Sequence, residues 1–465
     1  MPAGAGGLDA TRSTAPLVSY FCDFAWLGGA EAAAGVALHV RGTEIEAVEV
    51  GATTPPAHAK QLAGLTLPGL ANTHSHAFHR ALRGRAQGGR GSFWTWRETM
   101  YAVADMLSPE QYFALARATY AEMALAGFTV VGEFHYLHHQ PGGARYDDPN
   151  AMGRAILEAA EAAGVKVVLL DTCYLEAGPG RALQGPQLRF GDADAEAWAA
   201  RAGDLADKGS NGSGAGFGAA IHSVRAVPPP AARVVAEWAA ERSLPLHFHC
   251  SEQPAENDEA QAVYGTTPVQ LLARAGALRP ASVAVHATHL GKDDARVLGE
   301  SSTGVCMCPT TERDLGDGIG PARRLLALGS PLALGSDSHA IIDPFEEMRA
   351  LELDERLASG QRGNFTTVQL LESATAAGYA ALGDPDGGRL TPGAPADFVT
   401  VSLDGPSLAG ATEASLLEAA VFAAGPRDVT DVVVAGRPIV EDGHHLLVGD
   451  VAEALRSVIN DLPWP

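Results

Sequence analysis

Positive charge is scarce in this sequence. Its 465 residues include 33 Lys and Arg against 55 Asp and Glu, which gives a formal net charge of -22, and the basic residues do not gather in runs. Nucleic acids and anionic membranes attract proteins through basic patches. We therefore expect neither as a partner, whereas a small anionic substrate is compatible with a few arginines that converge in one pocket.

Long hydrophobic runs and a regular cysteine pattern are also lacking. No apolar stretch approaches the roughly 20 residues of a membrane span, and the N-terminus has no basic segment followed by an apolar one. The 5 cysteines are an odd number spread along the chain, which favours reduced thiols over a disulfide framework. We expect a soluble cytoplasmic protein that assembles as a homodimer.

From residue 67 onward, short apolar runs alternate with alanine-rich helical segments. The expected strands are Leu67–Thr73, Thr129–Phe134, Lys166–Thr172, Gly216–Ile221, Leu246–Phe248, Ser282–Val285, Gly304–Met307 and Leu332–Gly335. The expected helices include Pro109–Ala126, Asn150–Ala163, Pro229–Arg242 and Thr267–Ala275. Such alternation favours a parallel sheet, and eight strands favour an α/β fold of the (β/α)8 barrel type over residues 67–388.

Both ends of the chain carry strand signals without long helical periods. They are, in chain order, Val36–Val40, Ile45–Val50, Asp397–Val401 and Asp431–Val434. We expect residues 1–66 and 389–465 to form one small β-sandwich domain beside the barrel. The Gly/Ser-rich stretch Lys208–Gly218 is predicted to be a variable loop.

The most informative motif is Asn72-Thr73-His74-Ser75-His76, at the end of the first apolar run. On a β-strand, residues i and i+2 point to the same face, so His74 and His76 can bind one metal ion together. Further polar residues stand at or just past the ends of later runs, namely His222, His249, Glu252, His286 and Asp337. A single histidine usually has an ordinary hydrogen-bonded role. Recurrence in order at strand ends, however, is typical of a site at the C-terminal mouth of a barrel.

A catalytic zinc site needs three or four protein ligands and a position for water. His74 and His76 supply two ligands, and Asp337 offers a carboxylate after the eighth strand. His247 and His249 lie on one face of the fifth strand, and we choose His249 because it is nearer the strand's C-terminal end. His247 is interpreted as a packed strand residue. The sequence thus predicts one divalent metal ion, with zinc as the best match.

Two more residues are predicted to act on a metal-bound water. Glu252 follows His249 by three residues, so its carboxylate can reach the water as a general acid/base without binding the metal. His286 ends the sixth strand and can hydrogen-bond the water or Asp337. For three histidines after the second strand, mouth lining and a polar loop both stay open: His135, His138 and His139. Four histidines of the terminal segments are expected at the surface: His39, His58, His444 and His445.

The order of these residues along the chain resembles the amidohydrolase superfamily, in its mononuclear aminohydrolase branch. More specific motifs are similar to the formimidoylglutamate deiminase family. They are Asn72–Phe78, Ser92–Glu98, Gly132–His139, His222–Arg225, Cys308–Glu312 with Leu315–Gly318, and Gly335–His339. The resemblance implies metal-dependent hydrolysis of N-formimidoyl-L-glutamate to N-formyl-L-glutamate and ammonia, a reaction of histidine degradation. Binuclear relatives hold a second ion with a lysine carbamate or an extra carboxylate. No lysine ends a predicted strand, so one ion is expected.

The substrate that the resemblance implies carries two carboxylates, which planar guanidinium groups bind in bidentate fashion. Arg225 follows the fourth strand and Arg97 lies in an aromatic loop after the first, so both are predicted to bind the carboxylates. Tyr136, His222 and His79 are predicted to complete the polar lining. His79 is a departure, because the family has glutamine at this position.

Two other functions fit parts of the pattern. A related mononuclear deaminase that acts on a guanine, cytosine or triazine-type ring would need a flat apolar slot in place of paired arginines. A metal-free binding protein on the same barrel would need a broken metal set, and none of the key positions is broken.

Overall fold

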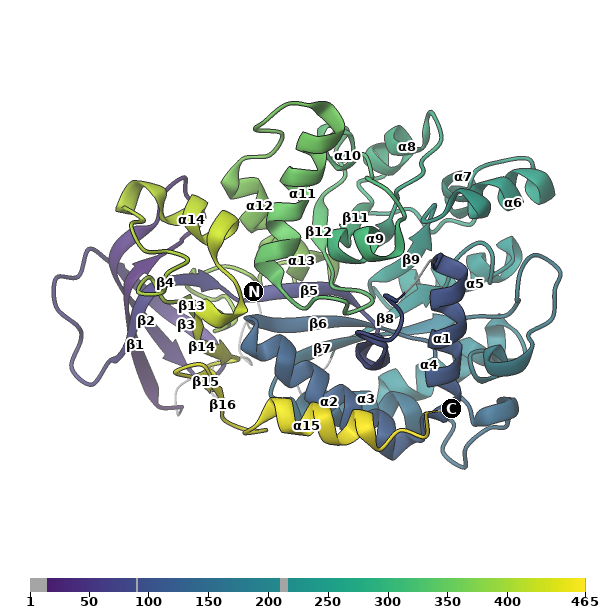
Figure 1. The fold of residues 1–465 in the computed structure, drawn as a ribbon, viewed down its shortest axis with the longest axis horizontal. Helices are drawn as coiled ribbons and strands as arrows, with labels where there is room; N and C mark the ends of the chain where they lie inside the picture. Colours follow the sequence, from purple (N-terminus) through teal and green to yellow (C-terminus); the bar gives the residue numbers. More distant parts are fainter. Residues whose placement is uncertain (1–14, 89–90, 210–215, 465) are drawn as a thin grey trace, which may run out of the picture.

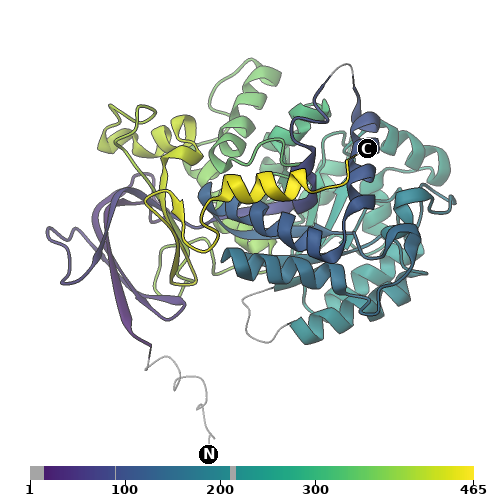
Figure 2. The ribbon, with the colours of Figure 1, turned by 60° about the horizontal axis from the view of Figure 1, so that its bottom comes forward.

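In the computed structural model the chain folds around two sheets that lie side by side (Figures 1 and 2). The structure describes residues 15–88, 91–209 and 216–464. The predicted variable loop falls largely on residues 210–215, outside the described part of the chain.

One sheet is the barrel that the alternating pattern predicts, and this part of the fold prediction is confirmed. Its parallel strands are β5 (Leu70–Ser75), β6 (Phe128–His135), β7 (Lys166–Cys173), β8 (Gly216–Ile221), β9 (Leu246–Cys250), β10 (Ser282–His286), β11 (Gly304–Met307) and β12 (Leu332–Leu334). The helices along this part of the chain are α1 (Phe93–Met106), α2 (Pro109–Leu125), α3 (Ala151–Ala163), α4 (Ala195–Gly209), α5 (Pro229–Glu241), α6 (Pro254–Tyr264), α7 (Pro268–Arg274), α8 (Asp294–Glu300), α9 (Pro309–Leu315), α10 (Ala322–Ala327), α11 (Pro344–Ser359), α12 (Thr367–Ala374) and α13 (Ala376–Ala381).

Local sequence signals explain these elements. Every residue of β5, β9 and β10 is buried, as expected for parallel strands covered on both faces. Helix α2 begins where the Ser108 side chain accepts a hydrogen bond from the Gln111 backbone N–H, with Pro109 in the first turn. Helix α3 ends at Gly164, whose φ of 79° suits a residue without a Cβ.

The first and last barrel strands meet beside His74 and Asp337. The N–H of Asp337 donates to the carbonyl of His74 at 3.0 Å, and Ser75 pairs with Asp337 in a parallel bridge. A Cβ on Gly335 would lie 2.8 Å from the Cβ of His74, so only glycine permits this approach. The closure therefore places a carboxylate of the last strand beside a histidine of the first.

Both termini contribute to the second sheet, as expected. Its strand order is β16-β15-β14-β13-β4-β1-β2-β3. The strands are β1 (Leu17–Ala25), β2 (Ala33–Arg41), β3 (Glu44–Val50), β4 (Lys60–Pro68), β13 (Phe398–Val401), β14 (Val429–Val434), β15 (Arg437–Glu441) and β16 (His444–His445). The expected strand Leu67–Thr73 is split at Gly69, whose N–H donates to the carbonyl of Asp397 at 2.8 Å.

Two histidines of this sheet differ from the expected surface position. His445 is 3% exposed, and its Nδ1 accepts from the backbone N–H groups of Leu447 and Val448. His39 is half-buried, and its Nδ1 lies 2.8 Å from the Ser19 hydroxyl. Contacts with a neighbouring turn and a neighbouring strand bury these two rings, and the composition of the segments does not indicate such contacts.

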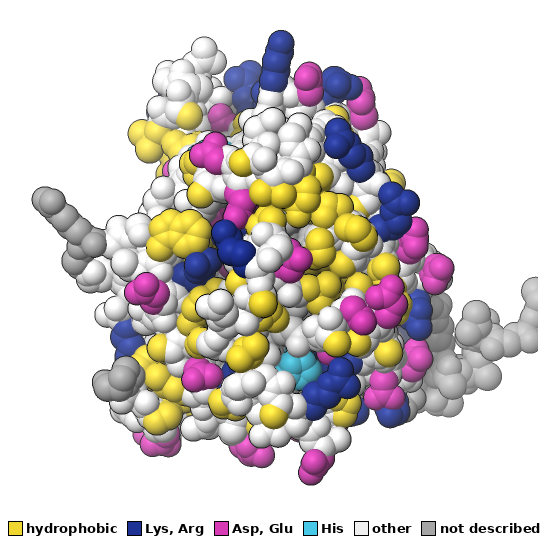
Figure 3. Space-filling model, turned by 90° about the vertical axis from the view of Figure 1, so that its right-hand side faces the viewer, with side chains coloured by type: hydrophobic (Ala, Val, Ile, Leu, Met, Phe, Trp, Pro, Cys, Tyr) yellow, Lys and Arg dark blue, Asp and Glu magenta, His cyan; other side chains and the backbone are white. Residues whose placement is uncertain are grey.

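The barrel starts beside the second sheet, so its C-terminal mouth lies at the opposite end. That end faces the viewer in Figure 3, where basic and acidic side chains are interspersed among hydrophobic ones. The C-terminal helix α15 (Val451–Asn460) lies along α2 (Figure 2). None of the described helices is long and apolar enough to cross a membrane.

A buried ionic cluster lies between β7 and α4. Arg201 donates to both carboxylate oxygens of Asp171 at 2.8 Å and to Asp192 at 3.0 Å. His138 bonds the Thr172 carbonyl at 3.0 Å, and His139 lies 3.5 Å from Asp192. The three histidines whose role was open are therefore buried near this cluster, and none of them lines the cavity described below.

Replacing Arg201 with methionine should destabilise the protein by about 3–5 kcal/mol, because it leaves two buried carboxylates uncompensated. Differential scanning calorimetry should show this as a clearly lower Tm. The matched control is Arg296→Met, which removes an exposed arginine from its pair with Glu300 and should leave the Tm nearly unchanged. Equal Tm values for the two variants would contradict the assignment.

Candidate active site

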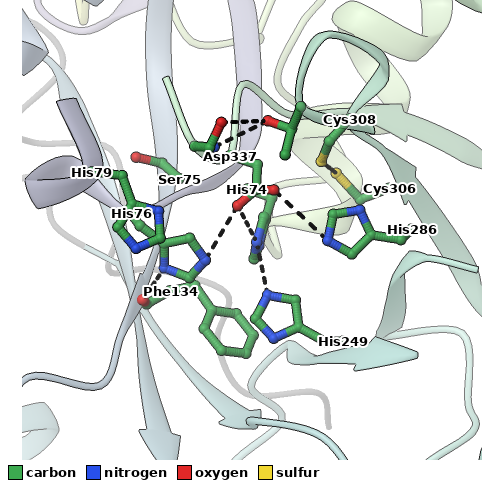
Figure 4. A network of polar contacts seen from close by, with 12 residues as sticks. His74, Ser75, His76, His79, Phe134, His249, His286, Cys306, Cys308 and Asp337 are labelled. Carbon is green, nitrogen blue, oxygen red and sulfur yellow. Dashed lines mark hydrogen bonds and ion pairs between the residues drawn. The ribbon is translucent and has the colours of Figure 1, made fainter. Parts of the chain in front are cut away.

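Four side chains converge where β5, β9 and β12 end (Figure 4). The Nε2 atoms of His74 and His249 are 3.1 Å apart. Asp337 Oδ1 lies 3.4 Å from His74 Nε2 and 3.3 Å from His76 Nε2. All four residues are buried. The structure thus brings the four predicted ligands together.

Backbone carbonyls fix which nitrogen of two histidines faces this cluster. His76 Nδ1 donates to the carbonyl of Phe134 at 2.9 Å, and His249 Nδ1 donates to that of His222 at 2.9 Å. Because a carbonyl only accepts, each Nδ1 carries the proton and each Nε2 keeps its lone pair. Burial lowers the pKa of His76 and of His249 well below the usual value, so both rings stay neutral.

The spacing of these atoms fits a metal ion. The Nε2 lone pairs of His76 and His249 face the cluster, where a cation could accept both of them. With tetrahedral bonds of about 2.0–2.1 Å, neighbouring ligand atoms lie about 3.3 Å apart. Three of the six separations in this set, those of His74–His249, His76–Asp337 and His74–Asp337, are 3.1, 3.3 and 3.4 Å. Three imidazoles and one carboxylate also match the donor preference of zinc.

Two groups that can transfer protons border the cluster. His286 Nε2 lies 3.7 Å from Asp337 Oδ2 and 3.8 Å from Glu252 Oε1, while its Nδ1 lies 3.3 Å from Glu312 Oε1. Burial alone would lower the pKa of His286, but the three carboxylates raise it well above its usual value. Burial, in turn, raises the pKa of Glu252. Groups with such shifted pKa values are suited to general acid/base work.

Backbone strain accompanies these positions. The φ angles are 70° at His286 and 41° at Asp337, in the left-handed region that non-glycine residues rarely adopt. Strain of this kind persists where the surrounding structure enforces it, commonly at functional sites. Both strand ends turn sharply here and direct their side chains at the cluster.

A cavity opens beside the cluster, and helix α1 covers one side of it. The lining residues are His76, His79, Phe93, Trp96, Arg97, Met100, Tyr101, Tyr136, Tyr174, Phe190, His222, Arg225, His249, Glu252, His286, Leu315 and Asp337. The segment with Arg97 was expected to be a loop, and this is wrong, because it forms α1. The lining positions 93, 96, 97, 100 and 101 are spaced as on one face of a helix, and this spacing could have predicted the helix from the sequence.

The two predicted arginines reach this cavity from different elements. The Arg97 guanidinium lies over the rings of Trp94 and Tyr101, at 4.5 and 5.4 Å. That of Arg225 lies 5.9 Å from the ring centre of Phe93. Within the described residues, neither guanidinium has a hydrogen bond or an ion pair. Two charged planar donors are therefore free to bind carboxylates.

The other predicted lining residues are brought together as well. His79 Nε2 lies 3.0 Å from the hydroxyl of Tyr136, which also contacts the Met100 sulfur. Burial lowers the pKa of His79 to about 3. His222 is neutral too, because burial and then the positive charges of Arg225 and Arg97 lower its pKa. All of these side chains can act as hydrogen-bond partners for a polar ligand.

Several supporting residues escaped the sequence reasoning. Glu133 accepts from the Ser75 hydroxyl and from the Ala77 N–H, both at 2.7 Å, and so braces the histidine motif from behind. Arg189, fully buried, donates to the carbonyls of Leu107 and His139 at 2.7 and 2.8 Å and thereby anchors the end of α1. Their roles depend on contacts between segments that are distant in the sequence, and no local motif predicts these contacts.

The chain matches the model of the amidohydrolase family over residues 65–439. It is 39% identical over 415 residues to a formimidoylglutamate deiminase of Pseudomonas aeruginosa, covering 87% of this chain and 91% of the relative. A crystal structure of an amidohydrolase from Brucella melitensis superposes with a TM-score of 0.88 at 32% identity, covering 96% and 99% of the two chains. An atrazine chlorohydrolase of Arthrobacter aurescens in complex with zinc shares the fold, with a TM-score of 0.83 at 21% identity over 95% and 99% of the chains. The chain therefore belongs to the amidohydrolase family.

Proposed function

We propose that the protein hydrolyses N-formimidoyl-L-glutamate to N-formyl-L-glutamate and ammonia. The observation that carries this proposal is the pair of unpartnered guanidinium groups, Arg97 and Arg225, in the cavity that borders the histidine cluster. The substrate has carboxylates at one end and a hydrolysable amidine at the other, so it matches both ends of the cavity. The related deiminase of Pseudomonas aeruginosa supports the same reaction.

The cluster of three histidines and Asp337 would hold one divalent ion, with zinc as the best chemical match. When bound, such an ion supplies a water whose pKa is about 7 and therefore hydroxide at neutral pH. A second ion is not proposed. Lys166, for example, lies at the start of β7, away from the mouth, and pairs with Asp397 at 2.5 Å.

Purified, metal-replete protein should contain about one equivalent of zinc by elemental analysis. His249→Gln should lose the ion and the activity, because an amide is a poor zinc ligand. His247→Gln is the matched control, since the His247 ring bonds the Ala381 carbonyl at 2.9 Å, and it should keep the ion. Two equivalents, or an active His249→Gln variant, would count against the site.

The chain's own groups would move the protons. His286, whose raised pKa keeps it protonated, orients the attacking water, and Asp337 takes up the proton of that water as a carbon–oxygen bond forms at the formimidoyl carbon. Glu252 then delivers a proton to the terminal nitrogen, the carbon–nitrogen bond breaks, and ammonia leaves. The raised pKa of Glu252, due to burial, helps it to hold the proton until that step.

The far end of the cavity would set specificity. Arg97 and Arg225 bind the two carboxylates, and Tyr136, His222 and His79 complete the polar lining. The neutral His79, held by Tyr136, can donate or accept one hydrogen bond where the family has an amide. A flat purine-like ring would leave both guanidinium groups without partners, at a cost in binding.

An ammonia-release assay tests the function. It compares N-formimidoyl-L-glutamate, N-formimidoyl-L-aspartate, a formimidoyl alkylamine without carboxylates, and guanine. The glutamate compound should have the highest kcat/KM, because the proposed site binds its amidine at the histidine cluster and its two carboxylates at Arg97 and Arg225. Preferential turnover of guanine would replace the proposal with a ring deaminase.

A further inference from the structure

A second hollow, here called the outer groove, adjoins the active-site cavity. It is lined by Trp94, Arg97, Ala177, Arg181, Arg225, Ala255 and Glu259. Arg97 and Arg225 line both hollows, so these two side chains form the wall between them. The alanines leave the groove open, and a third arginine, Arg181, stands on its outer side.

Arg181 is held at this rim by a tight turn after β7. Its N–H donates to the carbonyl of Gly178 at 2.8 Å, and its own carbonyl accepts from the N–H of Ala177 at 2.8 Å. A Cβ on Gly178 would lie 1.7 Å from the Arg181 Nη2, so the guanidinium folds back over Gly178 and would have to move if this residue gained a side chain. The same loop is tied to the Arg225 segment, because the N–H of Leu175 donates to the Ala226 carbonyl at 2.8 Å.

The charge of Arg181 is partly offset by its neighbour on α6. Arg181 Nη2 donates to Glu259 Oε1 at 2.8 Å, and the two side chains are 61% and 24% exposed. Exposed pairs of this kind add little to stability. The pair nevertheless places one positive and one negative group on the outer side of the groove. Arg97 and Arg225, which have no hydrogen bond or ion pair within the described residues, lie further in.

We propose that the outer groove is the entry route for the aliphatic dicarboxylate substrate, and that Arg181 is its first carboxylate contact. This inference rests on the proposed function. A protein with a net charge of -22 repels an anion at long range, so local positive charge at the entrance raises the rate of productive encounter. Glu259 limits this effect by occupying Arg181. The incoming carboxylate exchanges with Glu259 and then passes to Arg225 and Arg97.

Two substitutions should therefore act in opposite directions. Arg181→Gln should lower kcat/KM for N-formimidoyl-L-glutamate by about three- to tenfold at low ionic strength, with kcat unchanged. Glu259→Gln should raise kcat/KM by about two- to fivefold, because it frees the guanidinium. Both effects should shrink in about 0.5 M KCl, where charges are screened within a few ångströms.

The controls separate this steering from net charge and from structure. Arg296→Gln and Glu300→Gln change the same charges in an exposed pair on α8 and should leave kcat/KM unchanged. Gly178→Ala keeps the Arg181 charge but displaces its head group, and should lower kcat/KM as Arg181→Gln does. The formimidoyl alkylamine without carboxylates should respond to none of these variants.

The outcomes also separate a failure of the proposed entry route from a failure of the proposed hydrolytic function. If wild-type protein turns over the dicarboxylate but Arg181→Gln and Glu259→Gln shift kcat/KM in the same direction, or no more than the α8 controls, the entry route is wrong and the function stands. If wild-type protein does not turn over the dicarboxylate at all, both are wrong.

Discussion

Glu252→Gln should lower kcat by about two orders of magnitude or more, the usual scale for loss of a general acid/base. The amide has nearly the shape of the acid but cannot deliver a proton to the leaving nitrogen. Glu252 Oε1 lies 3.8 Å from His286 Nε2, beside the histidine cluster. Steady-state ammonia release, with zinc content measured on the same samples, tests this expectation.

Metal retention is the control for this variant. The zinc content of Glu252→Gln should equal that of wild type, because Glu252 belongs to none of the candidate metal-binding groups among the described residues. A variant that loses its metal, yet regains turnover when zinc is added back, would make Glu252 a ligand. Its role as the acid would then be wrong.

Arg225→Met should reduce kcat/KM for N-formimidoyl-L-glutamate by roughly tenfold to several hundredfold, since a charge-assisted bond in a desolvated site contributes about 1.5–3 kcal/mol. Methionine keeps much of the side-chain volume and removes the charge. The Arg225 guanidinium has no hydrogen bond to the described chain, but the buried Glu256 and Glu252 carboxylates raise its pKa, so Tm is measured alongside kcat/KM to show that the variant still folds.

Two comparisons make the Arg225 prediction specific. The formimidoyl alkylamine without carboxylates should lose far less kcat/KM in the variant than the dicarboxylate does. Arg242→Met removes a guanidinium that lies 4.7 Å from the Trp238 ring centre on α5, away from the cavity, and should have little effect on either compound. Equal losses on both compounds would mean that Arg225 supports the barrel and not the ligand.

Much of the barrel could be predicted because its signals are local. An apolar run followed by a polar residue marks several strand ends, and the ranges Gly216–Ile221 and Gly304–Met307 agree with β8 and β11. The spacing of His74 and His76 and the place of Asp337 after the last strand predicted that they would meet. The closure of the barrel brings them together.

Other features depend on contacts that a sequence does not display. The end of β4 and the start of β5 were predicted as one apolar strand, but the chain breaks at Gly69, whose N–H bonds the carbonyl of Asp397, just before β13. The carbonyl of Phe134 orients His76, but a carbonyl carries no sequence signature. Helix α1 was missed although its lining positions have helical spacing, because its aromatic residues suggested a loop.

The most direct test of the account is to identify the products formed from N-formimidoyl-L-glutamate by NMR. Attack of water at the formimidoyl carbon gives an intermediate that can expel either nitrogen. Glu252 is proposed to protonate the terminal one, so N-formyl-L-glutamate and ammonia should appear in equal amounts. Glutamate and formamide as products, or no reaction by zinc-replete protein, would contradict the account.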